Sequence, residues 1–151
     1  MKRSQRIEVA QRVADQREQS KAQALAASER SLQECEAKLR ELEGYRLGYI
    51  KDFAQRASLG MDASRARDYQ IFLARLDEAL AQQSELVQRA RALRDSERSG
   101  WQSAAQRADV VERMMQHVKS DEHRADEKRE QLESDERSQR QWARGQTTRG
   151  T

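Results

Sequence analysis

The feature that most constrains the fold is a run of apolar residues spaced at alternating steps of four and three along the second half of the chain. Twelve of its fifteen positions are apolar. The fifteen are Tyr69, Leu73, Leu76, Leu80, Gln83, Val87, Ala90, Arg94, Glu97, Trp101, Ala104, Ala108, Val111, Met115 and Val118. This heptad spacing keeps one stripe of a helix facing a partner helix. The sequence therefore predicts a long helix that packs against a second helix.

A similar but looser repeat runs along the first half of the chain. Its positions are Leu25, Leu32, Cys35, Leu39, Leu42, Tyr45, Tyr49 and Phe53. Two consecutive steps of four, from Tyr45 to Tyr49 to Phe53, predict that the supercoil relaxes at this point. The chain contains no proline, so the residue that most strongly breaks helices is absent.

The one strong break between the two repeats is the segment 57–64 (ASLGMDAS). Gly60 suits the left-handed conformation that ends a helix. Asp62 or Ser64 suits the start of the next helix, where a side-chain oxygen accepts a free backbone N–H. We therefore predict an all-α fold, a long antiparallel two-helix coiled coil. Helix 1 covers about residues 3–57, the turn covers 57–64, and helix 2 begins at about residue 64.

The lengths of the two repeats agree with a single hairpin. Helix 1 has about 55 residues and would extend roughly 80 Å at 1.5 Å per residue. A partner of the same length that starts at residue 64 would end at Val118, where the apolar repeat stops. Residues 119–141 hold only two apolar residues, so we expect an unpaired helical overhang there. Residues 1–141 thus form one domain, and we expect a disordered tail over 142–151.

Composition argues against several functional classes. Charged residues make up 36% of the chain, the net charge is only +3, and the two signs are interleaved. This pattern favours a solvated helix surface over a basic nucleic-acid-binding face. Two histidines and one cysteine leave little for a metal site, and a two-helix hairpin offers no deep pocket. We therefore expect no enzyme activity, no catalytic residue, no metal, no cofactor, no small-molecule substrate and no nucleic-acid partner.

Targeting signals are also lacking in the sequence. No apolar run approaches the roughly 20 residues of a membrane span. The first residues are basic but lack the apolar part of a secretory signal. We therefore expect a cytoplasmic protein.

Near the predicted turn, the chain carries more apolar residues than a two-stranded seam needs. Phe72, Leu76, Ala79 and Gln83 form a second stripe on helix 2, and Leu42, Tyr45 and Tyr49 lie at the matching end of helix 1. Tyrosine is enriched at protein interfaces. Gly44 and Gly48 would let a partner backbone come close on this side. Two interpretations remain open here: a docking surface, or thicker packing of the hairpin itself.

Several segments resemble the FliJ family of the flagellar type III export apparatus. They are residues 45–49 (YRLGY), residues 69–83 (YQIFLARLDEALAQQ), Trp101, and residues 130–136 (EQLESDE). Their order and spacing carry the resemblance, which spans residues 17 to about 137. Two alternatives remain: the equivalent stalk protein of a virulence injectisome, and a generic structural coiled coil that dimerises end to end.

The resemblance implies a fold similar to the central stalk helices of rotary ATPases, and a non-enzymatic role as activator of the hexameric flagellar export ATPase. That ATPase would take the open end of the hairpin. The resemblance also implies contact with the cytoplasmic domain of the export-gate membrane protein and escort of export chaperones. Through these partners the protein would lie at the inner face of the cell membrane. The residues it assigns to gate contact are Leu42, Tyr45, Tyr49, Phe72, Leu76, Ala79 and Gln83.

Overall fold

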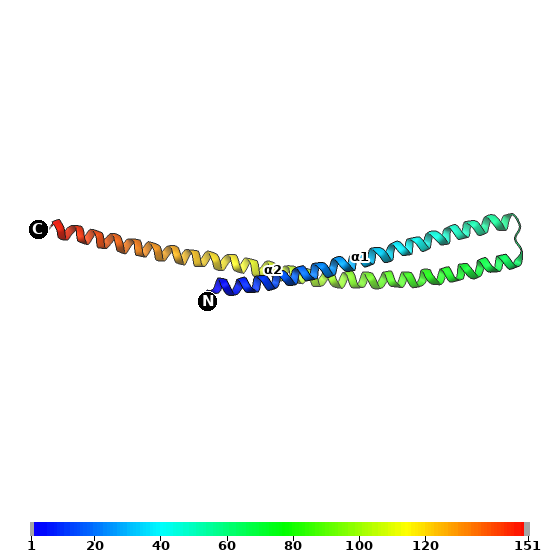
Figure 1. Cartoon of the computed structure of the whole chain (residues 1–151), viewed down its shortest axis with the longest axis horizontal. Helices are drawn as coiled ribbons and strands as arrows, with labels where there is room; N and C mark the ends of the chain where they lie inside the picture. The colour runs from blue at the N-terminus through cyan, green and yellow to red at the C-terminus, as the bar shows by residue number, and fades with distance from the viewer. Residues whose placement is uncertain (1, 150–151) are drawn as a thin grey trace. The chain divides into compact units, whose positions relative to one another are not determined.

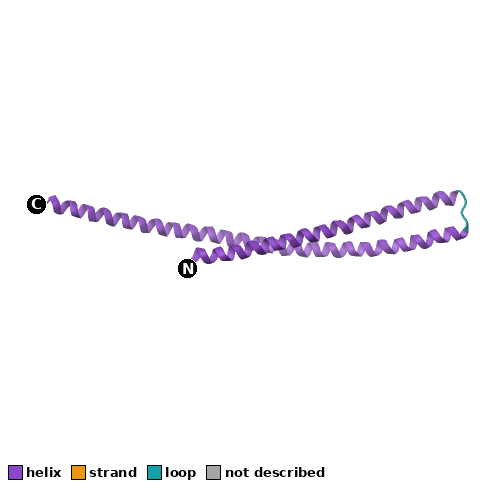
Figure 2. Ribbon diagram, viewed as in Figure 1, coloured by secondary structure: helices purple, strands orange, loops and turns teal. Residues whose placement is uncertain are grey.

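A computed structural model describes residues 2–149 as two α-helices joined by one turn (Figures 1 and 2). Helix α1 spans Arg3–Ser58 and helix α2 spans Ala63–Arg149. The two helices run antiparallel and pack against each other, and residues 2–149 include no strand. The predicted all-α helical hairpin is confirmed.

The turn forms as its residue types predict. Gly60 has a φ of +95°, in the left-handed region, and its N–H donates to the carbonyl of Ala57 at 3.3 Å. Asp62 caps α2, because its Oδ1 accepts the backbone N–H of Arg65 at 2.8 Å. Helix α1 therefore ends one residue later than predicted, and α2 begins one residue earlier.

An uninterrupted heptad seam joins the two helices. We count Leu32 as position a in α1 and Val87 as position a in α2. Every residue at positions a and d is then buried or half-buried, from Ser4 to Phe53 in α1 and from Ala66 to Glu122 in α2. The predicted seam of α2 is therefore confirmed at all fifteen positions.

The predicted stutter in α1 is wrong. Arg46, and not Tyr45, occupies the seam, so the alternation of four and three continues through Leu42, Arg46, Tyr49 and Phe53. The long apolar stem of an arginine can pack over a seam while its guanidinium group stays solvated. Here the Nε of Arg46 reaches Oδ1 of Asp77 on α2 at 2.6 Å. Tyr45 points outward and is 58% exposed.

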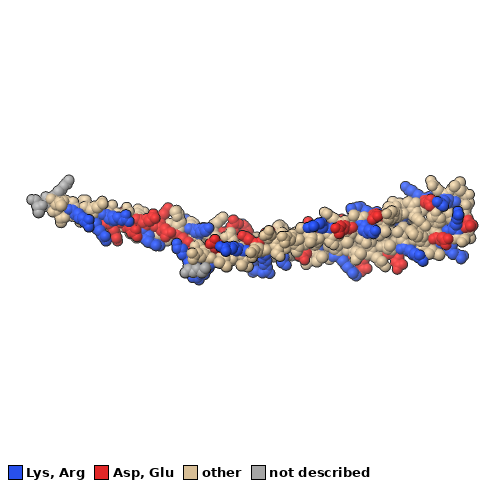
Figure 3. Space-filling model, viewed as in Figure 1, with Lys and Arg blue, Asp and Glu red and all other residues tan. Residues whose placement is uncertain are grey.

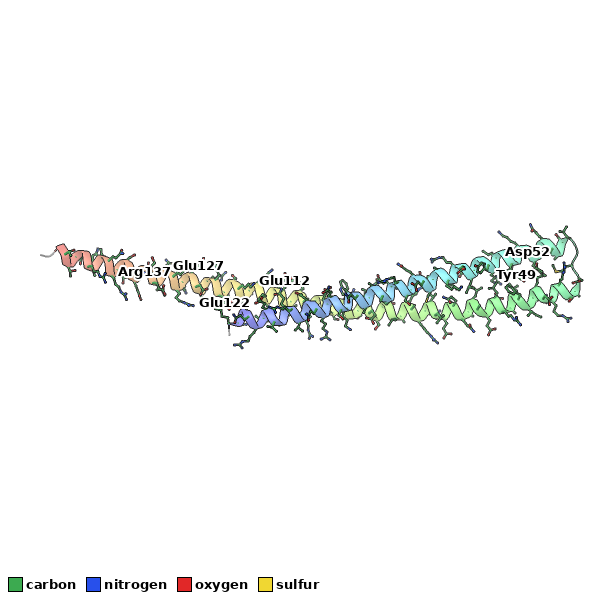
Figure 4. All side chains as sticks on the ribbon, in the orientation of Figure 1. Tyr49, Asp52, Glu112, Glu122, Glu127 and Arg137 are labelled. Atoms are coloured by element: carbon green, nitrogen blue, oxygen red, sulfur yellow. The ribbon has the colours of Figure 1, made fainter. Side chains whose placement is uncertain are left out.

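The chain forms two compact units. One holds the turn and residues 18–104, and the other combines the two terminal segments, up to residue 17 and from residue 105. In the terminal unit, Oε1 of Glu122 accepts the backbone N–H of Ser4 at 3.2 Å, at the start of α1 (Figure 4). A carboxylate at this point satisfies a free N–H and complements the positive end of the helix dipole.

The overhang of α2 starts slightly later than residue 119. Glu122 is still half-buried, and every described side chain after it is exposed. Pairing between the helices therefore ends at Glu122, one turn beyond Val118.

Residues 142–149 are helical, where the sequence predicted a disordered tail. No proline interrupts α2, and the hydroxyl of Thr147 donates to the carbonyl of Arg144 at 2.9 Å within the helix. Local ion pairs line the overhang, such as Arg137–Glu133 at 3.7 Å and Arg129–Asp126 at 3.4 Å. Figure 3 shows side chains of both charges along this stretch. The remaining tail residues, 150–151, lie outside the described part of the chain.

Two leucines of α1 test the seam directly. Leu32 is 5% exposed at position a, whereas Leu47 is 61% exposed at position b. We expect Leu32→Ala to lower the free energy of unfolding by about 2–4 kcal/mol, because it leaves a cavity between the helices. Leu47→Ala should change it by less than about 0.5 kcal/mol. Urea denaturation followed by circular dichroism measures both, and equal effects would contradict the seam.

Candidate functional site

Within the unit of residues 18–104, the two sides of the seam carry different chemistry. One side is formed by position e, where three ion pairs link the helices. Their distances are 3.5 Å for Arg91–Glu36, 3.7 Å for Arg98–Glu29 and 2.6 Å for Arg46–Asp77. We call this side the charged flank, defined by Glu29, Glu36, Asp77, Arg91 and Arg98.

The opposite side carries position g and has a different character. On α2, position g is occupied by Phe72, Ala79, Leu86 and Leu93, and on α1 by Ser31, Lys38 and Tyr45, with Ala24, Asp52 and Gly100 at its outer ends. We call the first seven residues the apolar flank, which on α1 includes the polar Ser31 and Lys38. Among residues 2–149, the ion pairs that join α1 to α2 all lie on the charged flank. None of them crosses the apolar flank, whose larger apolar side chains are about half exposed.

The structure brings the seven residues predicted for gate contact to the side of the apolar flank. Leu42, Tyr49, Leu76 and Gln83 occupy position d, and Tyr45, Phe72 and Ala79 occupy position g. Positions d and g are neighbours on a helix, because they are three or four residues apart. The set is therefore continuous in space although it comes from two helices.

The seven residues differ in how much they pack the hairpin. Leu76 is only 8% exposed and belongs to the seam, and the amide of Gln83 donates to the carbonyl of Cys35 at 3.0 Å. Tyr45 and Phe72 are the most open, at 58% and 46% exposed. The position-d residues thus pack the hairpin, and the position-g residues present apolar area to solvent.

Stacked aromatic rings join the helices next to the turn. The ring of Tyr49 lies 4.3 Å from that of Phe72 and 5.0 Å from that of Tyr69, and Phe53 lies 5.2 Å from Tyr69, measured between centroids. Figure 4 shows Tyr49 directed from α1 toward α2. Such pairs stabilise beyond the area that they bury. They hold Phe72 in place at the end of the apolar flank.

Hydrogen bonds fix the polar ends of two tyrosines. The hydroxyl of Tyr69 donates to Oδ2 of Asp52 at 2.6 Å, and that of Tyr45 donates to Oε1 of Glu41 at 2.8 Å. The bond to Asp52 raises the pKa of Tyr69 and lowers the pKa of Asp52. The bond to Glu41 raises the pKa of Tyr45. The acidic partners thus orient both hydroxyls and disfavour their ionisation.

A hollow of about 470 Å³ lies beside Phe72. It is lined by Tyr49, Asp68, Ile71, Phe72 and Arg75. The described residues hold no cluster of histidine, cysteine and acidic side chains suited to a metal ion. Within residues 2–149, neither helix has a stretch long and apolar enough to pass through a bilayer. The arrangement can therefore offer an apolar contact surface with a polar rim.

Sequence reasoning missed the length of the apolar flank. Leu86 and Leu93 are 46% and 52% exposed and continue the spacing of seven from Phe72 and Ala79. That spacing is visible in the sequence, but the second stripe predicted on α2 ends at Gln83.

Comparison with known proteins gives one match. The profile of the family described as "Flagellar FliJ protein" matches residues 3–147, which is nearly the whole chain. No curated protein and no solved structure shows a significant match.

The hydrogen bond between Tyr69 and Asp52 leads to a prediction about how stability depends on pH. Because the pKa of Tyr69 is raised, its contribution to stability is present below the ordinary value of 10.0 and is lost as the pH rises through the raised pKa. Asp52→Asn should move the Tyr69 titration back toward 10.0, as followed by NMR of labelled tyrosine rings. Glu41→Gln is the matched control and should move only Tyr45. An unchanged Tyr69 titration in Asp52→Asn would refute the assigned cause.

Proposed function

The chain belongs to the flagellar FliJ family, and we propose that it acts there as a non-enzymatic stalk that activates the export ATPase ring and contacts the export gate. Membership of the family gives the protein a role related to flagellar protein export. It also favours a flagellar protein over the injectisome protein and the generic coiled coil that the sequence alone leaves open. The division of labour between ATPase and gate is our proposal.

The apolar flank carries the proposal of gate contact. The resemblance assigned seven residues to the gate, and these seven fall on positions d and g of one side, although their sequence numbers run from 42 to 83. Tyr45 and Phe72 expose about half of their area at the end of the flank next to the turn. Large exposed aromatic side chains are frequent anchors of protein interfaces. One open apolar side therefore supports docking of the cytoplasmic domain of the gate protein.

The open end of the hairpin and the α2 overhang are proposed to enter the ATPase ring. Beyond Glu122 the described side chains of α2 are exposed and carry both charges. Exposed ion pairs within a helix bind weakly and exchange with water. A helix covered by them can sit in a ring pore without one tightly locked pose. The escort of export chaperones is proposed from the family resemblance alone, and a position at the membrane would follow from gate binding.

Tyr45→Ala separates the two proposed roles. We expect gate affinity to fall by about tenfold, because an exposed anchor is lost. Stimulation of ATP hydrolysis by the export ATPase should remain, since Tyr45 lies near the turn. Unfolding free energy should change by less than about 0.5 kcal/mol. Isothermal titration calorimetry and steady-state ATP hydrolysis measure the two activities, and loss of both together would contradict the division of labour.

Alanine substitutions at two glycines of α1 provide a matched pair of variants that tests the proposed gate surface. An added methyl group meets no other atom within 4 Å at Gly44 or at Gly48, but only Gly48 borders the apolar flank, at position c. Either change to alanine should stabilise the helix by about 0.5–1 kcal/mol. Only Gly48→Ala should weaken gate binding, by severalfold, because the methyl group keeps the partner away. Equal affinities of the two variants would refute close approach at Gly48.

A further inference from the structure

The apolar flank extends well beyond the residues that the resemblance assigns to the gate. Its α2 side runs from Phe72 through Ala79 and Leu86 to Leu93 in steps of seven. These residues span about 31 Å along the helix at 1.5 Å per residue. At the far end, the Lys21 side chain lies 3.9 Å from where a Cβ would stand on Gly100 and covers the next position g. The open stretch is thus bounded by the hollow at Phe72 and by Lys21.

Apolar residues spaced seven apart form a pattern along which a third helix can pack. Residues in steps of seven form a straight stripe along a supercoiled helix, which an adjacent helix can follow over its whole length. The hairpin covers this stripe only in part, because Leu86 and Leu93 remain about half exposed while the ring of Phe72 packs against Tyr49. A compact domain would meet only a few of the four residues, whereas a helix of about 21 residues would meet them all.

Charged residues at position c beside the apolar flank indicate which charges a bound helix would carry. On α2, position c holds Arg75, Gln82 and Arg89, and on α1 it holds Glu34 and Glu41. Arg89 pairs with Glu85 at 2.8 Å and Glu41 pairs with Lys38 at 3.7 Å, and both are exposed pairs within one helix that a partner can replace. Arg75 lies with Asp68 on the rim of the hollow beside Phe72. A helix seated between these borders is stabilised by acidic residues along its α2 edge and basic residues along its α1 edge.

A second copy of the chain fits this stripe poorly. Two copies packed in parallel about a twofold axis would set Leu86 against Lys38 of the other copy, and Leu93 against Ser31. Two antiparallel copies, centred on the stripe, would set Arg75 beside Arg89 of the other copy. The first arrangement leaves apolar area against polar groups, and the second opposes like charges. The flank therefore favours a foreign helix.

We propose that the apolar flank, from Phe72 to Leu93, binds one amphipathic helix of about 21 residues from the cytoplasmic part of the gate protein. This helix is acidic on the edge beside Arg75 and Arg89 and basic on the edge beside Glu34 and Glu41. The proposal rests on the proposed gate contact and deepens it, because it adds Leu86 and Leu93 and names the form of the partner. Packing of this helix converts the hairpin locally into a three-helix coiled coil.

The test uses the full chain with Leu86→Glu and Leu93→Glu together. The matched control is Ala81→Glu with Ala92→Glu, which adds the same two charges at exposed positions b and f of the same helix. Thermal unfolding by circular dichroism establishes that both variants fold. Calorimetry then measures affinity for the purified cytoplasmic domain of the gate protein. We expect at least about a tenfold loss for the first pair and less than about a twofold change for the control.

The other outcomes are decisive as well. Unchanged gate affinity of the Leu86→Glu, Leu93→Glu variant overturns the proposal but leaves gate contact at Tyr45 intact. If the gate domain does not bind the wild-type chain, the proposed gate contact fails. A synthetic 21-residue peptide with leucines in heptad spacing, glutamates along one edge and lysines along the other then decides the inference. Binding to wild type with loss in the variant retains the flank as a helix site, and no binding overturns it.

Sedimentation of the chain alone tests the remaining candidate for the apolar flank, which is a second copy of the chain. We expect the wild type to sediment as a monomer over a wide range of concentrations. A concentration-dependent dimer that Leu86→Glu and Leu93→Glu abolish would identify a second copy on the flank and would overturn the proposal.

Discussion

The hairpin depends on the unbroken alternation of four and three that places positions a and d of both helices against each other. With only two helices, burial at this seam is the main source of tertiary stability, since the exposed ion pairs contribute a few tenths of a kcal/mol each. The seam also fixes where every other residue stands. Once Leu32 and Val87 share the seam, Tyr45 must face one flank and Glu36 the other. The candidate site therefore combines residues of seam position d with residues of the outward position g of the same seven-residue repeat.

The two flanks differ in what they leave for a partner. On the charged flank, ion pairs between α1 and α2 use up the charged groups within the hairpin itself. On the apolar flank, Phe72, Leu86 and Leu93 keep about half of their area in water, which costs free energy in the isolated chain. Exposed apolar area in a continuous stripe is typical of an interaction surface. Within residues 18–104, this asymmetry leaves exposed apolar area on one side of the seam and ion pairs between the helices on the other.

Much of the fold follows from spacing alone. The seam of α2, the left-handed Gly60 and the Asp62 cap were predictable because each depends on residue type and local sequence. The seam position of Arg46 was not predictable, because only apolar residue types were counted as seam residues. The apolar stem of Arg46 packs at the seam, and its guanidinium pairs with Asp77 on the other helix. The Glu122 cap on Ser4 joins residues far apart in sequence and needs the register of the hairpin. At the candidate site, the spacing of the residues is visible in the sequence, but which of them pack and which face solvent required both helices.

The register of the seam is the central claim, and the native Cys35 offers a direct measurement of it. Cys35 faces Gln83 across the seam, whereas the neighbouring Gln82 is exposed at position c. Gln83→Cys and Gln82→Cys, each treated at low protein concentration with a short bismaleimide, would be compared by mass spectrometry of the digested chain. The account predicts an efficient link within one chain from residue 83 to Cys35 and little from residue 82. Equal linking from both residues, or links formed only between chains, would contradict it.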